Sequence, residues 1–256
     1  MRGFWAVYRK ELYGMFMSPI FYVVGFMFLL VSGVFFNYIL SQVMLFSFQI
    51  AQHPEIAKGM SMLELFFRSF MWNISIIMLF IAPLLTMRLY AEERKSGTIE
   101  LLFTYPVTDA AVLAGKFTAC LSAFVILLAG TLPGVIGVSL MATPAWKLIA
   151  CGYGAVFLLG CAFFSLGIFA STLTRNQIIS AVISFGLLLV LWFIGEAKSS
   201  AGPLLGSILE YVSVAKHFEN LSKGLIDSRD IIFYVVFSAF FLFLTLRQMS
   251  SYRWRG

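Results

Sequence analysis

The sequence has few charged residues. Only 12% of its 256 residues are Asp, Glu, Lys or Arg, whereas 61% are hydrophobic. Soluble domains carry about 25% charged and about 45–50% apolar residues. The composition therefore argues against a soluble domain and favours an integral membrane protein. The net charge of +6 comes without a basic cluster on a soluble fold, so nucleic acid is not expected as a partner.

Residues that bind metals or carry out catalysis are also scarce. Two histidines, His53 and His217, lie far apart in the chain, and the three cysteines have no metal-ligand spacing. We expect no metal site, packing roles for the cysteines, and solvated or interfacial positions for both histidines. A membrane-embedded enzyme would need His, Asp or Ser gathered at one depth, and the sequence shows no such cluster.

The sequence contains no G-x-x-x-x-G-K-[ST] phosphate-binding loop. Gly115 and Lys116 are followed by Phe117 and lack the upstream glycine, so they cannot cradle a nucleotide phosphate. Ionisable residues are absent from the middle of the predicted spans, which argues against proton- or sodium-driven transport. We therefore expect that the chain is not an enzyme, binds no cofactor itself, and takes any energy for transport from another polypeptide.

Apolar runs dominate what is present. Six of them are long enough to be spans, because about 20 apolar residues cross the hydrocarbon core. The fold class that we predict is an all-α integral membrane protein, with six transmembrane helices in one domain, residues 19–256. The connections at residues 41–68 and 196–230 are polar, the first partly helical, and Gly130 and Pro133 break the third run. The runs cover residues 20–40, 69–90, 110–140, 147–172, 178–195 and 231–246.

The first sixteen residues are predicted to form an amphipathic helix. On a helical wheel Trp5 and Tyr8 fall on an apolar arc, whereas Arg9 and Lys10 fall on the opposite side. This pattern is typical of a helix that lies in the headgroup plane. Val7 does not fit the apolar arc. A break before Pro19 then favours a separate N-terminal interfacial helix, residues 1–18.

Basic residues are distributed unevenly between the two sides of the predicted bundle. Six spans place both termini on one side, which carries 11 of the 18 Lys and Arg residues but 5 of the 12 acidic residues. The other side carries 7 of each. Because cytoplasmic loops are enriched in Lys and Arg, both termini and residues 92–108 are expected to face the cytoplasm.

Residues 92–108, which read EERKSGTIELLFTYPVT, are the longest polar interruption in the first half of the chain. Gly97 is predicted to end the helix that leaves the membrane. Residues 98–103 then form a second short helix whose apolar residues share one face, and Pro106 ends it. The residues alone fit either a helix that docks in a partner's groove or one that lies on the lipid surface.

This segment resembles the first cytoplasmic loop of ABC-2 type ABC transporter permeases. In that family an acid-rich helix end is followed by G-T-x-E-x-L-L, then P-V and a downstream G-K. The matching positions are Gly97, Thr98, Glu100, Leu101, Leu102, Pro106, Val107, Gly115 and Lys116. The resemblance implies that the loop is the coupling helix, which contacts a separate ATP-binding subunit, and that the N-terminal helix is the connecting helix beside it. The coupling residues that it implies are Glu93, Arg94, Gly97, Thr98, Glu100, Leu101, Leu102 and Pro106.

The resemblance also implies the partners. These are two copies of an ATP-binding subunit that hold ATP and Mg²⁺, a second permease subunit that is identical or homologous, and membrane lipid. The expected place is the bacterial inner membrane, as a multi-pass protein, and the expected activity is ATP-driven export. The alternative is a membrane scaffold or assembly protein that recruits a cytoplasmic ATPase through the same loop and transports nothing.

Residues 213–234 resemble the segment before the last span in permeases of the gliding-motility-associated and nitrous-oxide-maturation branches of this superfamily. The residues of the predicted outer helix or of its ends that we single out are His217, Phe218, Gly224 and Asp227, with Asp230 as a further match. A short helix is expected on or in the outer leaflet, with Gly224 at its end and Asp227 or Ser228 as cap of the last span. A capped surface loop accounts for these residues equally well.

Overall fold

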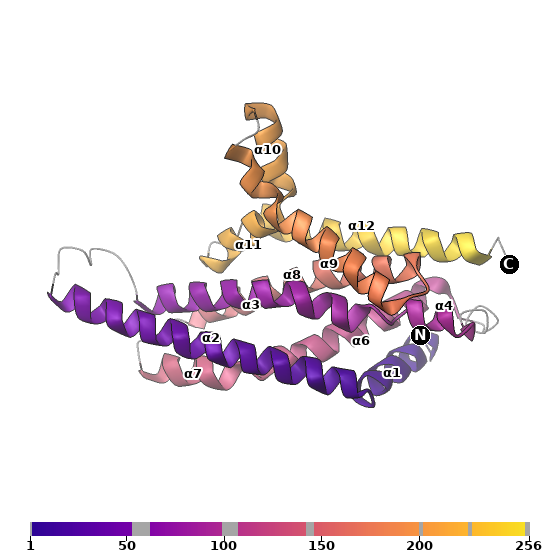
Figure 1. Cartoon of the computed structure of the whole chain (residues 1–256), viewed down its shortest axis with the longest axis horizontal. Helices are drawn as coiled ribbons and strands as arrows, with labels where there is room; N and C mark the ends of the chain where they lie inside the picture. Colours follow the sequence, from indigo (N-terminus) through magenta and orange to yellow (C-terminus); the bar gives the residue numbers. More distant parts are fainter. Residues whose placement is uncertain are drawn as a thin grey trace.

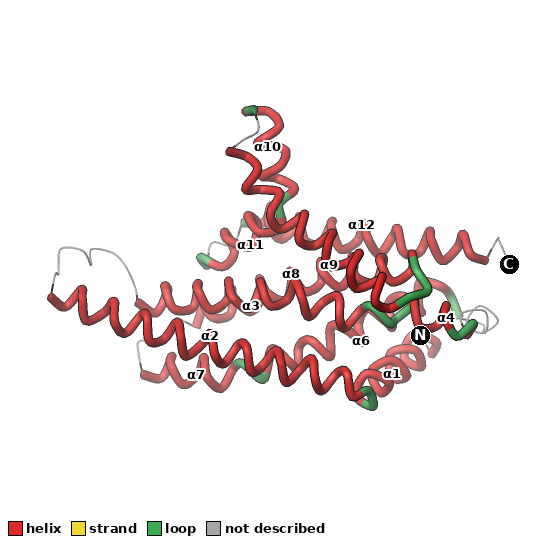
Figure 2. Tube along the Cα trace, viewed as in Figure 1, coloured by secondary structure: helices red, strands yellow, loops and turns green. Residues whose placement is uncertain are grey.

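The computed structural model describes residues 2–52, 62–98, 107–141, 146–199, 202–224 and 227–253, and these residues form helices joined by short turns (Figure 2). Six helical stretches among them are long and apolar enough to cross a membrane, so the predicted fold class is confirmed. The elements are α1 (Arg2–Phe16), α2 (Pro19–Gln52), α3 (Met62–Thr86), α4 (Ala91–Lys95), α6 (Asp109–Ala129), α7 (Leu132–Met141), α8 (Trp146–Leu173), α9 (Gln177–Phe193), the 3-10 helix η2 (Ile194–Ser199), α10 (Pro203–Val212), α11 (Val214–Ser222) and α12 (Ser228–Arg253).

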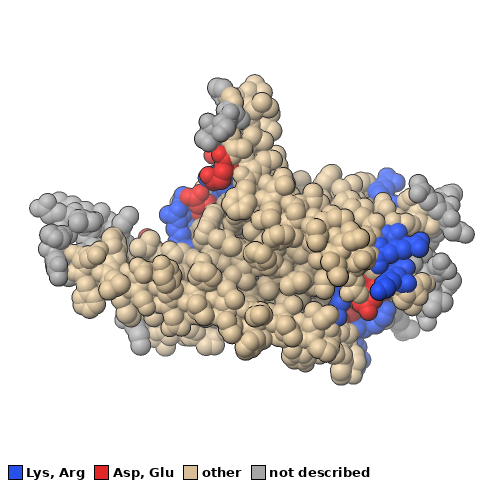
Figure 3. Space-filling model, viewed as in Figure 1, with Lys and Arg blue, Asp and Glu red and all other residues tan. Residues whose placement is uncertain are grey.

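The long helices run side by side along one axis (Figure 1). Both termini, α1 and α4 lie at one end of the bundle, which we call the terminal end, and the end of α2 and the start of α3 lie at the opposite, far end. Helix α10 stands out sideways from the bundle. On the face shown in Figure 3, Lys and Arg side chains gather at the terminal end and below α10, and a band without charge lies between them. Such a band is what the hydrocarbon core of a membrane requires.

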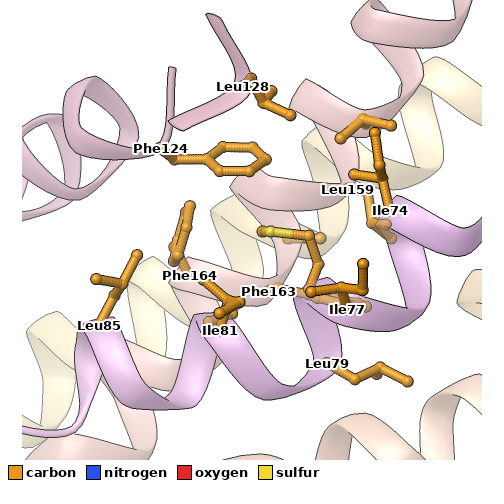
Figure 4. Close-up of a cluster of buried hydrophobic side chains, with 14 of the residues drawn as sticks. Ile74, Ile77, Leu79, Ile81, Leu85, Phe124, Leu128, Leu159, Phe163 and Phe164 are labelled. Carbon is orange, nitrogen blue, oxygen red and sulfur yellow. The ribbon is translucent and has the colours of Figure 1, made fainter. Parts of the chain in front are cut away.

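Helices α3 and α8 form the centre of the bundle. Of the residues in the most apolar 18-residue stretch of each helix, 67% are buried in α3 and 72% in α8. The corresponding shares in α2, α9 and α12 are only 22–28%. Phe124 of α6 and Phe164 of α8 meet edge to face between these helices, with ring centroids 5.3 Å apart (Figure 4). The outer helices instead leave large apolar side chains exposed, as expected of helices that contact lipid or another membrane chain.

Glycine lets α8 approach α3 closely at one position. A β-carbon added at Gly167 would lie 2.2 Å from Oγ1 and 3.0 Å from Cβ of Thr86 on α3. Thr86 cannot turn away freely, because its hydroxyl donates a hydrogen bond of 2.8 Å to the carbonyl oxygen of Ala82. The core of the bundle therefore depends on a small residue at this crossing, as is usual between membrane helices.

The two polar connections contain more helix than the sequence indicated. Helix α2 continues to Gln52 and α3 begins at Met62, and the residues between them lie outside the described part of the chain. The hydroxyl of Ser41 donates to the carbonyl oxygen of Asn37, so this polar residue is satisfied inside α2 and does not end it. The second connection contains η2 and α10 in addition to α11, whereas only one short helix was expected within this polar return. The predicted break of the third run is confirmed, because α6 ends at Ala129 and α7 begins at Leu132.

The Gly167 crossing can be tested by a pair of substitutions in the same helix. Gly167→Ala is expected to destabilise the protein by about 1–3 kcal/mol, because the added methyl group overlaps Thr86. Gly154→Ala is the control, because a β-carbon there meets no atom within 4 Å, and Ala favours a helix over Gly by about 0.5–1 kcal/mol. Thermal unfolding in detergent measures both. Equal unfolding midpoints for the two variants would contradict the close approach of α3 and α8.

Candidate functional site

A buried lysine lies at the terminal end of the bundle. Lys116 belongs to the second turn of α6, and its side chain is only 1% exposed. Its ammonium group donates three hydrogen bonds: to Glu11 Oε1 at 2.8 Å, to Glu93 Oε1 at 2.9 Å, and to the carbonyl oxygen of Leu89 at 2.8 Å. An ammonium group has three N–H donors, so each has an acceptor. Lys116 therefore joins α6 to α1, to α4 and to the turn that precedes α4.

The charges around Lys116 are close to balanced. The two carboxylates of Glu11 and Glu93 face the buried ammonium, and Nζ of Lys10 on the surface lies 3.7 Å from Glu93 Oε1. The ring of Tyr90 lies beneath the ammonium, with Nζ 4.9 Å from its centroid. A buried charge is tolerated only when partners replace its water, and here three acceptors and an aromatic face do so.

Helix α1 packs along α6, and the contact runs through Val7. A β-carbon added at Gly115 of α6 would lie 2.9 Å from Val7 Cγ1, and the hydroxyl groups of Tyr8 and Ser122 are 3.0 Å apart. Val7 is thus part of a packed face that the predicted apolar arc did not include. Trp5 stays 62% exposed. Helix α1 packs with its Val7 face on a glycine of α6, and a helical wheel gives no information on contacts with another helix.

The other predicted residues of α1 also differ in how exposed they are. Arg9 and Lys10 are exposed, as predicted, whereas Tyr8 is half-buried against α6. Glu11, next to Lys10, faces inward and binds Lys116. The helix therefore has one face on α6 and an opposite face with Trp5 and two cations.

Helix α4 is attached to α8 by one serine. The hydroxyl oxygen of Ser171 accepts hydrogen bonds from the backbone N–H groups of Tyr90 and Ala91, at 3.1 and 3.0 Å, and donates one to the carbonyl oxygen of Met87 at 3.0 Å. It serves as a cap for α4 from another helix, since Tyr90 itself provides no side-chain cap. No sequence pattern pointed to Ser171, because a serine inside an apolar span usually bonds within its own helix.

A predicted coupling residue, Arg94, strengthens this attachment. Its guanidinium group donates to the carbonyl oxygen of Thr172 on α8 and lies over the ring of Tyr252 on α12, 4.4 Å from the centroid. The short helix α4 is thus held by α6, α8 and α12 together, although it contains only five residues.

The end of α4 follows the sequence pattern closely. Gly97 has a φ of +72°, a left-handed conformation that favours glycine and that commonly ends helices. The hydroxyl groups of Ser96 and Thr98 are 2.9 Å apart. At the other end of the segment, Thr108 caps α6 by accepting from the N–H of Ala111 at 3.3 Å.

Half of the predicted coupling residues lie between these two ends. Glu100, Leu101, Leu102 and Pro106 fall outside the described residues, and so does the predicted helix at residues 98–103 beyond Thr98. The structure therefore fixes where the segment leaves and re-enters the bundle. Both points lie at the terminal end, within reach of α1, because a β-carbon added at Gly3 would lie 2.9 Å from Val107 Cγ1.

A polar cavity of about 350 Å³ lies between α1 and α4 at this end. Arg88 on its wall donates a hydrogen bond of 2.6 Å to the hydroxyl of Ser18 at the junction of α1 and α2. Glu93 contributes to the wall, and its second oxygen, Oε2, is buried without a hydrogen-bond partner among the described residues. The charged side chains that line the cavity are Lys10, Glu11, Arg88, Glu92 and Glu93. Such a lining suits contact with a polar protein surface and not with hydrocarbon.

The predicted outer residues lie elsewhere, around α11. Phe218 is fully buried and its ring centroid lies 6.0 Å from that of Trp72. Gly224 follows the end of α11 with a φ of +75°, and Asp227 caps α12 by accepting from the N–H of Arg229 at 2.9 Å. The predicted short helix, the glycine after its end and the cap of the last span are therefore present, separate from the cluster around Lys116.

His217 differs from its prediction. It is 8% exposed, and each of its ring nitrogens faces an acceptor: Nδ1 lies 2.5 Å from Asp230 Oδ1, and Nε2 lies 2.9 Å from the carbonyl oxygen of Tyr211. Its ring also stacks on Phe233, with centroids 4.0 Å apart. The prediction of a solvated histidine is wrong here, because α10, α11 and α12 enclose the ring.

A second ionic contact ties α11 to α3. Arg68 and Glu219 are 3.1 Å apart, and Lys223 lies 3.0 Å from the same carboxyl group. The hydrogen bond from Lys223 lowers the pKa of Glu219, and the charges of Lys216 and Arg68 add to this effect. Glu219 is therefore ionised at neutral pH and keeps α11 on the bundle.

The contribution of Lys116 can be measured with a matched pair of lysines. Lys116→Met is expected to lower the free energy of unfolding by about 3–5 kcal/mol, because two carboxylates lose their buried partner. Lys10→Met removes an exposed lysine beside the same carboxylates and should cost at most about 1 kcal/mol. Chemical unfolding in detergent measures both variants. Adding Glu11→Gln and Glu93→Gln to Lys116→Met should recover part of the loss, and no recovery would contradict the assigned pairing.

The site and the bundle around it agree with one known family. A family model described as ABC-2 family transporter protein matches residues 5–249, which include all six candidate spans except the last residues of α12, together with most of α1 and all of α4. A search of curated proteins finds no match. Members of the matched family are membrane components that generally pair with an ATP-binding subunit and are not themselves enzymes. The chain belongs to the ABC-2 family of transporter proteins and is a multi-pass transmembrane permease.

Proposed function

We propose that this permease is driven by a separate ATP-binding subunit, which contacts residues 92–108, and that it works as an exporter. The observation that carries the proposal is the bonding of Lys116 to both Glu11 and Glu93. It connects the start of residues 92–108 with the N-terminal helix and with a membrane span. A push on this segment would therefore reach three elements at once.

The contacts of α4 support such a transmission. Charge-assisted hydrogen bonds are shorter and stronger than neutral ones, so the links from Lys116 and Arg94 resist separation. Lys116 links α4 to α6 and α1, whereas Arg94 and Ser171 link α4 to α8 at the centre of the bundle. In this proposal the coupling residues are Glu93, Arg94, Gly97, Thr98, Glu100, Leu101, Leu102 and Pro106.

The orientation and the partners extend the same proposal. The excess of Lys and Arg at the terminal end supports a cytoplasmic location for both termini. The proposed site of the bundle is the inner membrane of a bacterial cell. Two ATP-binding subunits would hold ATP and Mg²⁺, and a second permease, identical or homologous, would face the exposed sides of α2, α9 and α12. The gliding-motility and nitrous-oxide-maturation branches remain a prediction from residues 213–234.

The alternative of a scaffold that recruits an ATPase and transports nothing uses the same contacts. It differs in its consequence: ATP hydrolysis by the complex would move no substrate. ATP-dependent loss of fluorescent amphiphiles from vesicles that contain the complex separates the two functions.

The docking proposal is tested by a double substitution in the complete complex. Glu100→Lys with Leu102→Asp is expected to reduce co-purification of the ATP-binding subunit by about tenfold or more, because loss of a central interface residue costs about 2 kcal/mol or more. Glu100→Asp with Leu102→Met keeps charge and volume at the same positions and should retain the subunit. If the first variant retains the ATP-binding subunit and its ATPase stimulation as well as the second does, residues 92–108 are not the docking segment.

A further inference from the structure

The geometry points to a binding site for a compact, uncharged amphiphile inside the membrane, between α2 and the break that separates α6 from α7. A cavity of about 220 Å³ lies there, and its lining includes Leu29, Ser32, Phe36, Gly130, Thr131 and Gly134. The inference concerns this chain alone and does not depend on how residues 92–108 contact an ATPase.

The cavity lies at a helix start within a membrane span. Helix α6 ends at Ala129 and α7 begins at Leu132, and Pro133 in its first turn has no N–H group. The first turn of a helix has N–H groups without partners in the helix and carries a partial positive charge. The hydroxyl of Thr131 does not serve this turn, because it donates to the carbonyl oxygen of Leu128 at 2.7 Å and lies 2.8 Å from the hydroxyl of Tyr153.

Ser32 is the second observation that indicates a ligand. It lines the cavity, is 2% exposed, and its hydroxyl has no hydrogen-bond partner among the described residues. The hydroxyl groups of Ser41 and Thr118 in these spans bond to a carbonyl oxygen four residues earlier. Ser180, Ser184 and Ser238 are buried without a partner, as Ser32 is, but of these four serines only Ser32 lines the cavity. A buried polar group without a partner is unfavourable, so a ligand with one polar group gains by meeting Ser32.

The shape of the cavity follows from where α2 touches the break. A β-carbon added at Gly130 would lie 2.7 Å from Leu29 Cδ2, and one added at Gly134 would lie 3.2 Å from the Phe36 ring. Between these contacts, a β-carbon added at Gly33 meets no atom within 4 Å. Leu29 and Phe36 thus close the two ends of a space at Ser32 and Gly33.

The size and lining of this space define the ligand class. An engineered cavity of about 150 Å³ binds benzene, so this cavity can take one ring or a short aliphatic chain with a small polar group. None of the residues that line it is charged, which excludes an ionic ligand. Ser32 lies inside the apolar stretch Pro19–Gln49 of α2, which is long enough to cross the hydrocarbon core. The ligand therefore enters from the membrane, and its hydroxyl or carbonyl group meets Ser32.

Photolabelling of the full chain in phospholipid nanodiscs tests this site. The probe is benzyl alcohol that carries a trifluoromethyl diazirine, and labelled peptides are mapped by mass spectrometry. We expect labels within residues 29–36 and 130–134. Unlabelled benzyl alcohol should compete about two- to tenfold better than toluene at the same membrane concentration, because only the alcohol can hydrogen-bond to Ser32.

Three variants sharpen the test. Ser32→Ala should lower labelling about two- to tenfold while the space remains. Gly33→Leu should fill the cavity and abolish labelling there. Gly186→Leu on α9 adds the same side chain where a β-carbon also meets no atom within 4 Å, and it should change nothing.

Three results would overturn the inference. Labels spread over α2, α9 and α12 that persist in Gly33→Leu would show ordinary contact with annular lipid. Equal competition by toluene would show a purely apolar cavity, without recognition of a polar group. Unchanged labelling in Ser32→Ala would contradict the part given to its hydroxyl, even if Gly33→Leu fails to fold.

Discussion

The structure at the terminal end depends on the ammonium group of Lys116. This group is buried, so it needs acceptors in place of water, and it finds them on α1, on α4 and in the turn before α4. The three elements must therefore keep their relative positions for the charge to remain buried. A requirement of one side chain thus determines where residues 92–108 leave the bundle, and this is the segment that the proposed function needs to hold rigidly.

The rest of the bundle connects this end to the membrane core. Ser171 and Arg94 fix α4 to α8, and α8 packs on α3 through the close approach at Gly167. Helix α4 contacts α8 directly and follows α3 in the sequence, and these two helices are the most buried. Helices α2, α9 and α12 instead keep exposed apolar faces. A movement of α4 would reach the packed core first and the lipid-facing or partner-facing helices afterwards. The inferred cavity lies between one of these outer helices, α2, and the α6–α7 break.

Local signals in the sequence predicted much of this fold. Hydropathy identified the six spans, because each apolar run must cross about 30 Å of hydrocarbon, and a glycine and a capping residue marked the ends at Gly97 and Asp227. What the sequence did not predict depends on contacts between distant residues. Glu11 and Lys116 are 105 positions apart, and each alone suits an exposed end of a span. The burial of His217 has the same cause, because three helices must assemble before the ring is enclosed.

The claim that α1 and α4 are held as one unit by Lys116 is tested most directly by a distance. Spin labels at the exposed positions Arg9 on α1 and Lys95 on α4 can be measured by pulsed electron resonance in the complex with its ATP-binding subunit. The account predicts one narrow distance distribution that is the same without nucleotide and with ATP trapped. A distribution that shifts or splits when ATP binds would show that the two helices move independently, and it would contradict the account.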